Sequence, residues 1–353
     1  MDLELTDEQK LLSDSVETLL ERGGDAADAW TKIVEFGGLM VGPEGLGAVE
    51  LCLIANRLGA HLAAVPYLGS AAARYALLGA EGLPEGLGSL DEASTAIALA
   101  FVEPGGGWTL DGVRTALAGG TLAGEKAAVE HPDASDAVLV IATDGEGPAL
   151  ALVARDADGL ALSAQDSIDA GAPLGRATLD GVIAPADATL TGEGARAAFE
   201  RLLSIGGLLA AAEANGAAEV MLAQAVEYAS QRRQFGKTIG SNQALRHILA
   251  EMYVRRTSSW SSILYSAAAL DDGAPDAATA ASISKAYASR ATREVAHGAM
   301  QVFGGIAFTE EHDAHRFLRR INLRGSQFGD AEHHERLLGR ALAGSRTSAA
   351  TVA

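Results

Sequence analysis

The sequence predicts a mainly helical α+β fold in three consecutive parts: a helical N-terminal domain over residues 1–94, a middle β domain over 95–191 and a C-terminal four-helix bundle over 192–353. Apolar residues recur at helical spacing near both ends of the chain, whereas the middle part holds short apolar runs between Gly, Asp and Pro. Aromatic residues make up only 5% of the chain while Ala, Gly and Leu dominate, which favours helices that approach one another closely.

Composition and charge exclude several classes of protein. With 353 residues, 48% of them hydrophobic, the chain can bury a sizeable core. A net charge of -19 argues against nucleic-acid binding, which needs a broad basic face. The lone Cys52 excludes an intramolecular disulfide framework. The acidic start does not resemble a signal peptide, and the most apolar stretch, 202–212, is shorter than the ~20 residues that cross a bilayer. We therefore expect a cytoplasmic protein without a membrane or nucleic-acid partner.

The N-terminal domain is expected to begin with a helix in LTDEQKLLSDSVETLLER. Leu12, Val16 and Leu19 fall on one helical face, and Thr6 followed by Glu8 or Gln9 is typical of a helix start. Helical spacing continues to about Gly82.

The middle domain is predicted from a change of pattern between Ala96 and Thr191. Five short apolar runs follow one another there, each bounded by turn residues: IALAFVE, DAVLVIA, ALALVAR, GLALSA and ATLDGVIAP. Their spacing is typical of antiparallel strands.

The C-terminal bundle is predicted from four long helical stretches, over residues 195–233, 241–271, 276–303 and 330–343. The turn-rich segments GSNQ, DDGAP and FGGIAFTEE separate them. Four such helices can pack as a bundle.

A cluster of basic residues marks a candidate anion site in this acidic chain. The run QRRQFGKTIG, residues 231–240, holds three basic residues around Phe235 and Gly236 at a predicted helix end. Such clusters commonly only neutralise helix dipoles or pair with surface acids. However, an Arg beside an aromatic ring can bind a phosphate and a planar heterocycle together, and Gly allows close backbone approach.

A second run, HGAMQVFGGIAF, places Gln301 before the pair Gly304 and Gly305 at the end of another helix. A Gly pair there is commonly only a helix cap. Together, however, Arg232, Phe235, Gly236 and Ile239 with the later QVFGGIAF closely resemble the paired signatures of the acyl-CoA dehydrogenase family. The segments MDLELTDEQKLLSDSV and EFGGLMVGPEGLGAVELCLIANRLG resemble the opening helices of that family, so the resemblance spans nearly the whole chain.

The resemblance implies a flavoenzyme fold in which FAD lies across a subunit interface. One protomer's β domain would hold the isoalloxazine ring, and the neighbour's bundle would hold the pyrophosphate and adenosine. By motif match, the cofactor-binding residues of this chain are Arg232, Phe235, Gln301, Gly304 and Gly305. The anion would then be the FAD pyrophosphate, bound for a neighbouring subunit.

The family reaction is α,β-dehydrogenation of an acyl-CoA thioester, for which a Glu removes the α proton. In SQFGDAEHHE, Gly329 occupies the position at which the family carries that Glu, and the alternative position of a minority of relatives falls on Gly206. A missing general base typically costs about 100- to 10,000-fold in rate. We therefore expect no catalytic residue in this chain.

The flavin-facing motifs of the β domain differ from the family as well. VEPGGGW, residues 102–108, keeps Glu103 and Pro104 but loses the Thr and the Gly-Ser-Asp of relatives, and GEKAAVEH lacks their aromatic ring and hydroxyl donors. Residues lent to a neighbour's FAD are kept, while those for the chain's own flavin and substrate are lost. The resemblance therefore implies the FAD-completing subunit of a heterotetrameric acyl-CoA dehydrogenase with an unlike partner.

Two alternatives remain open. A self-sufficient homo-oligomeric dehydrogenase would need a displaced base, for which Asp330 and Glu332 are candidates, although carboxylates at a helix start are ordinarily dipole partners. A flavin-free scaffold of the same fold would bind only a partner. No metal site is expected, because the pairs His312–His315 and His333–His334 lack further ligands at a metal-binding spacing.

Overall fold

The computed structural model describes residues 4–42, 45–77, 83–88 and 94–351, with residues 344–351 described by their backbone alone. The chain forms two compact units. The first, here called the bundle unit, comprises Met1–Asp14, Cys52–Leu62 and Gly207–Ala353. The second, the sheet unit, comprises Ser15–Leu51 and Ala63–Gly206.

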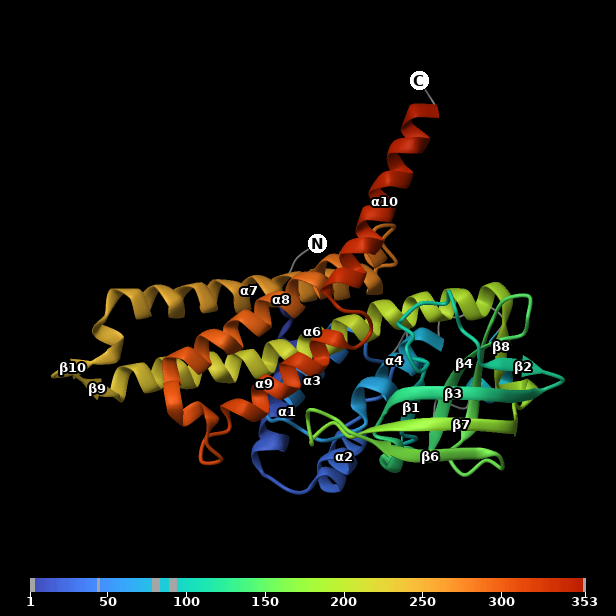
Figure 1. Ribbon diagram of the computed structural model, residues 1–353, viewed down its shortest axis with the longest axis horizontal. Coiled ribbons are helices and arrows are strands. Elements are labelled where there is room, and N and C mark those ends of the chain that lie inside the picture. Colours follow the sequence, from blue (N-terminus) through green and yellow to red (C-terminus); the bar gives the residue numbers. More distant parts are fainter. Residues whose placement is uncertain (1–3, 43–44, 78–82, 89–93, 352–353) are drawn as a thin grey trace. The chain divides into compact units, whose positions relative to one another are not determined.

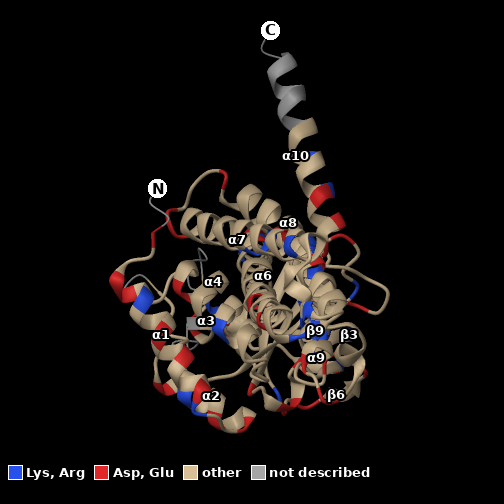
Figure 2. Cartoon of the chain, turned by 90° about the vertical axis from the view of Figure 1, so that its left-hand side faces the viewer, with Lys and Arg blue, Asp and Glu red and all other residues tan. Residues whose placement is uncertain are grey.

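The N-terminal part is helical, as predicted. Its helices are α1 (Asp7–Glu21), α2 (Ala26–Glu35), α3 (Ala48–Ala60), α4 (Tyr67–Leu77) and the short α5 (Glu85–Gly88). The predicted helix start is confirmed, because the Thr6 N–H donates to Gln9 Oε1 at 3.0 Å and the Gln9 N–H donates to Thr6 Oγ1 at 3.2 Å. Acidic side chains lie in the first turns of α1 and α2 (Figure 2), where they complement the positive end of the helix dipole.

The sheet unit contains one mixed sheet (Figure 1). Its strands are β1 (Ile97–Ala100), β2 (Ala116–Ala118), β3 (Thr121–Glu130), β4 (Ala137–Thr143), β5 (Pro148–Ala154), β6 (Leu160–Gln165), β7 (Leu174–Ile183) and β8 (Thr189–Thr191), in the spatial order β6-β7-β3-β2-β4-β5-β8 with β1 beside β4. The five predicted runs form β1, β4, β5, β6 and β7, whereas β2, β3 and β8 were not predicted.

The expectation of a purely antiparallel sheet is wrong at two strand pairs. β1 and β2 both pair with β4 in the parallel direction, with Ile97 opposite Ala137 and Ala116 opposite Thr143. A parallel pair requires a long connection, which the 36 residues between Ala100 and Ala137 supply for β1. The buried faces of the strands of this sheet form an apolar core that includes Leu122 of β3 and Val140 of β4.

The bundle unit contains the predicted long helices. Most of their ends lie within three residues of the predicted positions. The helices are α6 (Gly192–Gln231, which enters this unit at residue 207), α7 (Gln243–Asp271), α8 (Ala277–Phe303) and α10 (Ala331–Thr351). α7 and α8 run alongside each other (Figure 1). None of the described helices combines the length and apolar character that a membrane span requires.

A fifth long helix in this part, α9 (Ala314–Ser326), was not predicted. Its buried face includes Phe317 and Ile321 but also Arg320 and Arg324. Two charged residues on the core side obscure the apolar periodicity from which a helix is recognised.

Close helix contacts confirm the expectation drawn from the small residues. A β-carbon on Gly216 of α6 would lie 1.8 Å from the carbonyl oxygen of Asn56 in α3, and one on Gly59 would lie 1.9 Å from that of Glu213. The two helices therefore approach at a distance that only Gly permits at these positions.

Candidate functional site

Four of the five predicted cofactor residues line one cavity of the bundle unit. The cavity encloses about 490 Å³, and its wall includes Arg232, Gln301, Gly304 and Gly305. The remaining lining residues are Tyr228, Gln234, Ile239, Val302, Phe303 and Ile306. Sequence segments about sixty residues apart are thus brought together at the adjoining ends of α6 and α8.

Arg232 is held by its backbone at the end of α6. Its N–H donates to the Tyr228 carbonyl at 2.8 Å, and its own carbonyl accepts from the Ile239 N–H at 2.9 Å. The second bond closes a hairpin of β9 (Arg233–Gln234) and β10 (Lys237–Thr238). The guanidinium is exposed and has no hydrogen-bond or ion-pair partner among the described residues, so it is available to an anion.

Gly304 and Gly305 form an open part of the wall. Gly304 ends α8 with a φ of +66°, which favours Gly, and its N–H donates to the Met300 carbonyl. A β-carbon on either residue would meet no atom within 4 Å, so the absence of side chains leaves room for a ligand. An Arg, the Gln301 amide and a bare backbone surface suit the pyrophosphate and adenosine of FAD.

Phe235 is the predicted cofactor residue that does not join the others. It lies in the β9–β10 hairpin with a φ of +51°, is 99% exposed and is not part of the cavity wall. In the part of the chain that the structure describes, the Phe235 ring therefore projects away from the cavity at Arg232.

Two aromatic contacts that the sequence did not indicate support the wall. Tyr228 and Phe303 meet edge to face with ring centroids 5.7 Å apart, and Phe303 lies 4.4 Å from the His312 ring. His312 thus packs on the wall of the cavity.

A side chain at position 329, the position that the resemblance assigns to the family's Glu, would clash with two His rings. Gly329 has a φ of +93°, and a β-carbon there would lie 2.5 Å from His333 Cδ2 and 2.9 Å from His334 Nε2. The His334 Nε2–H donates to the Phe328 carbonyl at 2.9 Å. Burial lowers the pKa of His334 to about 4, although its bond to Phe328 opposes that change, so the ring is neutral near pH 7.

The two candidate displaced bases already have local partners. Asp330 Oδ1 accepts from the His333 N–H at 2.8 Å at the start of α10, and Glu332 Oε1 pairs with Arg336 Nη1 at 2.6 Å. These are the capping and ion-pair roles that acidic residues ordinarily take in a first helical turn.

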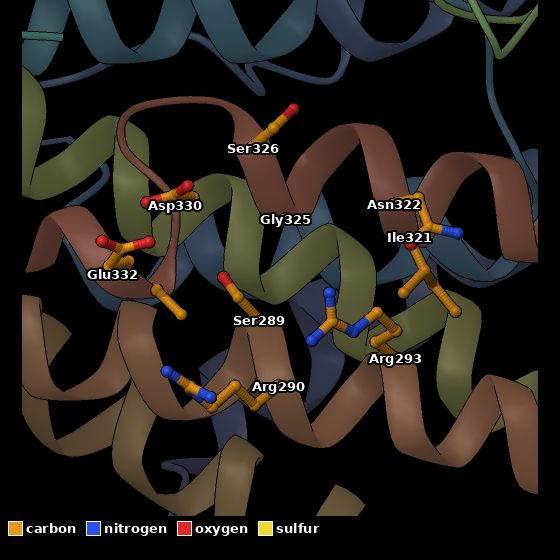
Figure 3. A pocket seen from close by; sticks show the side chains of 10 residues that line it. Ser289, Arg290, Arg293, Ile321, Asn322, Gly325, Ser326, Asp330 and Glu332 are labelled. Carbon is orange, nitrogen blue, oxygen red and sulfur yellow. The ribbon is translucent and has the colours of Figure 1, made fainter. Parts of the chain in front are cut away.

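A buried ionic network lies in the bundle unit beside the loop that connects α9 to α10 and contains Gly329 (Figure 3). Glu213 of α6 accepts from Arg320 Nη1 at 2.6 Å and pairs with Arg324 Nε at 2.9 Å. Lys285 of α8 donates to the Arg324 carbonyl at 2.5 Å, and Arg324 also donates to Gln327 Oε1. Burial and the neighbouring Arg324 lower the pKa of Lys285 to about 7, while Asp330 opposes that shift. This network anchors the chain just before Gly329.

The sequence analysis missed this network. The available signal was a charge inside an apolar helix, as with Glu213 in LLAAAEANGAA. Such a charge is buried only with partners, which the sequence does not identify.

In the sheet unit, the retained Glu103 has a structural role. Its carboxylate accepts from Lys126 Nζ at 3.0 Å, from the backbone N–H groups of Arg114 and Thr115, and from Arg114 Nε at 3.1 Å. Burial raises the pKa of Glu103, but these hydrogen bonds outweigh it and lower the pKa to about 2. Lys126, from the altered GEKAAVEH run, is the buried counter-ion, and burial lowers its pKa to about 8.

No group of three or more His, Cys, Asp or Glu side chains that could hold a metal ion occurs in the part of the chain that the structure describes.

Comparison with known proteins identifies the family. Residues 192–343 match the sequence profile of the acyl-CoA dehydrogenase C-terminal domain. Over 337 residues the chain is 31% identical to acyl-CoA dehydrogenase FadE27 of Mycobacterium tuberculosis, a match that covers 90% of this chain and 88% of FadE27. The chain belongs to the acyl-CoA dehydrogenase family. Members of this family are FAD-dependent oxidoreductases, and the predicted fold class is confirmed.

Other relatives match only part of the sequence or are similar in structure. The chain is 39% identical to acyl-CoA dehydrogenase FadE34 of Mycobacterium tuberculosis over 131 residues, which are 37% of this chain but only 18% of FadE34. The solved ChsE4-ChsE5 complex of the same organism aligns with a TM-score of 0.84 and 27% identity, covering 97% of this chain and 99% of that one. The Tcur3481-Tcur3483 steroid acyl-CoA dehydrogenase, a G363A variant, aligns with a TM-score of 0.87 and 25% identity over 97% and 99%.

Proposed function

We propose that this chain is the FAD-completing subunit of a heteromeric acyl-CoA dehydrogenase and that it carries no general base of its own. The observation that carries the proposal is the contrast between an open cavity at Arg232 and a closed position at Gly329. The chain keeps what a neighbouring FAD site would need. At position 329, by contrast, a side chain would clash with His333 and His334 unless those rings moved.

The cavity residues would act on FAD by binding and orientation. Arg232 would pair with the pyrophosphate, Gln301 would donate or accept on the adenosine side, and Gly304 with Gly305 would leave the surface on which that part lies. Phe235, exposed on its hairpin, would pack against the cofactor only once a partner subunit brings the two together. When bound, FAD supplies the hydride acceptor for the β carbon of an acyl-CoA thioester.

The unlike partner is proposed from the missing base and from structural neighbours. Two neighbours that align over nearly the whole chain bear paired names, the ChsE4-ChsE5 complex and Tcur3481-Tcur3483. The latter is a steroid acyl-CoA dehydrogenase, so steroid-derived acyl-CoA thioesters belong in a substrate panel together with straight-chain ones. A mixed assembly would draw the general base and the flavin-facing aromatic ring from the partner.

A displaced base in this chain is less favoured, because Asp330 and Glu332 already cap and pair within α10. A flavin-free scaffold would give no reason for an unpartnered Arg and two open Gly residues in one cavity.

The test is a count of FAD per chain from the visible flavin spectrum. The protein is purified alone and again after co-expression with a candidate unlike acyl-CoA dehydrogenase chain. FAD in the mixed complex only, together with acyl-CoA dehydrogenation by that complex, is the expected result. One FAD per chain in the lone protein would refute the proposal in favour of a homo-oligomer, and absence of FAD from both preparations would favour a scaffold.

A further inference from the structure

The strand β6 (Leu160–Gln165) forms an outer edge of the sheet in the sheet unit (Figure 1). Among the described residues it pairs with β7 alone. An edge strand presents a row of backbone N–H and C=O groups that have no strand partner, and another chain can pair with that row. Native proteins ordinarily protect such edges with short strands, charged side chains, Pro or bulges.

The other ends of the sheet are protected, whereas β6 is not. At the opposite end of the strand order, β8 is only three residues long, and β1 beside β4 is buried throughout. The sequence of β6, LALSAQ, contains no charged residue and no Pro. Its pairing with β7 runs over all six residues without a register shift, so no bulge twists the edge away. None of the usual protections is therefore present in β6 itself.

The register identifies the backbone groups that point away from the sheet. The carbonyl of Gly159, just before β6, accepts from the Asp180 N–H of β7 at 3.0 Å. Because bonded and unbonded positions alternate along an antiparallel ladder, Leu162 and Ala164 turn their N–H and C=O groups outward. The side chains of Leu160 and Leu162 pack against the apolar core of the sheet, which holds the strand in place. The free edge is therefore preformed for pairing.

Acidic side chains lie at both ends of β6. Four exposed carboxylates there have no ion-pair partner among the described residues: Asp156, Asp158 and Asp180 at its beginning and Asp166 at its end. The nearby cation Arg155 is already paired with Asp133 at 2.9 Å. Arg176 of β7 lies opposite Ser163, at the centre of the strand and away from its two ends. The edge is thus neutral along β6 and negative at both of its ends.

This charge pattern selects the occupant of the edge. Two copies of β6 paired with each other would bring negative ends together, which is electrostatically unfavourable. We propose that the edge of β6 binds, by strand addition, an extended segment of a partner protein that is uncharged at its centre and carries Lys or Arg at both ends. Main-chain hydrogen bonds to Leu162 and Ala164 hold the segment, and the flanking Asp side chains select its basic ends.

Fluorescence anisotropy of short labelled peptides, titrated with the purified full chain, tests the proposal. One peptide alternates Thr and Val and has Lys at both ends, and a second peptide replaces each Lys with Glu. We expect saturable binding of the Lys peptide at one per chain and at least tenfold weaker binding of the Glu peptide. Hydrogen exchange at the amides of Leu162 and Ala164 is expected to slow when the Lys peptide is bound.

Variants place the peptide on the edge. Ala164→Pro removes an outward N–H but keeps the ladder to β7, which an edge strand tolerates, and is expected to weaken binding at least tenfold. Ala164→Ser keeps that N–H and is the matched control, with binding unchanged.

Three results would overturn the proposal. Equal binding by the wild type and Ala164→Pro would show only a general attraction of a basic peptide to an acidic chain. Absence of binding would exclude the edge as a docking site, as would a dimer of the lone chain that Ala164→Pro abolishes. If Ala164→Pro does not fold, unchanged exchange at Leu162 and Ala164 in the wild type decides against the proposal. None of these outcomes depends on FAD in a mixed complex, so this proposal and the proposed function can fail separately.

Discussion

His334 Nε2 lies 2.9 Å from the position that a β-carbon on Gly329 would occupy. The imidazole is buried and fixed by its bond to the Phe328 carbonyl, so it cannot move aside without losing that bond. The residue at position 329 and the residue at position 334 are therefore coupled. A side chain at position 329 would therefore require a rearrangement of His334 as well.

Gly329→Ala is expected to destabilise the protein by about 1–3 kcal/mol, because it combines a strained positive φ with a clash against His333 and His334. Gly325→Ala is the matched control, since it lies in open helix and should gain about 0.5–1 kcal/mol. Urea denaturation of both variants measures the difference.

Gly329→Glu is expected to leave the lone chain inactive in acyl-CoA dehydrogenation, because the added carboxylate has no position beside His334 from which to remove an α proton. Turnover comparable to a family member from this single change would show that the closed position is not the obstacle.

Glu213→Leu is expected to destabilise the protein by about 3–5 kcal/mol, since it leaves the buried Arg320 and Arg324 without their shared carboxylate. Glu335→Leu removes the partner of the half-exposed Arg290 and should cost about 0–1 kcal/mol. Equal effects of the two substitutions on the urea midpoint would contradict the assignment of the network as a structural anchor.

The sequence predicted those parts of the fold in which apolar residues follow one period. The long helices α6, α7 and α8 have many small apolar side chains in the core, and β4 and β5 are continuous apolar runs. The helix α9 and the strand β3 escaped prediction because their buried sides include charge: Arg320 and Arg324 in the first, and Lys126 in the second. A charged residue in an apolar sequence pattern is ordinarily taken to face solvent unless its ion-pair partner is known. Here the partners are distant in sequence.

The candidate site was predictable to a similar extent. Local motifs identified Arg232, Gln301, Gly304 and Gly305, which the fold brings to one cavity. They did not identify the direction of Phe235, because the turn conformation that points it to solvent depends on the hairpin and not on its neighbours in sequence. The ionic network that anchors the loop at Gly329 could not be predicted from the sequence either. Its member Lys285, which donates to the Arg324 carbonyl, is 44 residues away from Gly329.

His334→Gln is expected to reduce the acid sensitivity of the protein. The folded-state pKa of His334 is lowered to about 4 from the ordinary value of 6.5, so between these values the unfolded chain binds a proton that the folded chain does not. Stability should therefore fall as the pH drops from about 6.5 to 4, and the Gln variant should lack this part of the decline. Urea midpoints at intervals across this range measure the two slopes, and parallel curves would show that the ring titrates normally.

Arg232→Ala is expected to remove FAD from the mixed assembly while the assembly itself persists. A hydrogen bond between a charged donor and a ligand contributes about 1.5–3 kcal/mol, or about 10- to 150-fold in Kd, and nothing else among the described lining residues of the cavity is cationic. Arg233→Ala is the matched control, because Arg233 is the adjacent exposed Arg and does not line the cavity. Gel filtration with absorbance at 280 and 450 nm reports subunit association and bound flavin in one run. Retention of FAD by Arg232→Ala at the level of Arg233→Ala would contradict the assignment of this cavity to FAD. Loss of FAD in Arg232→Ala alone would indicate that a residue of this chain binds the cofactor.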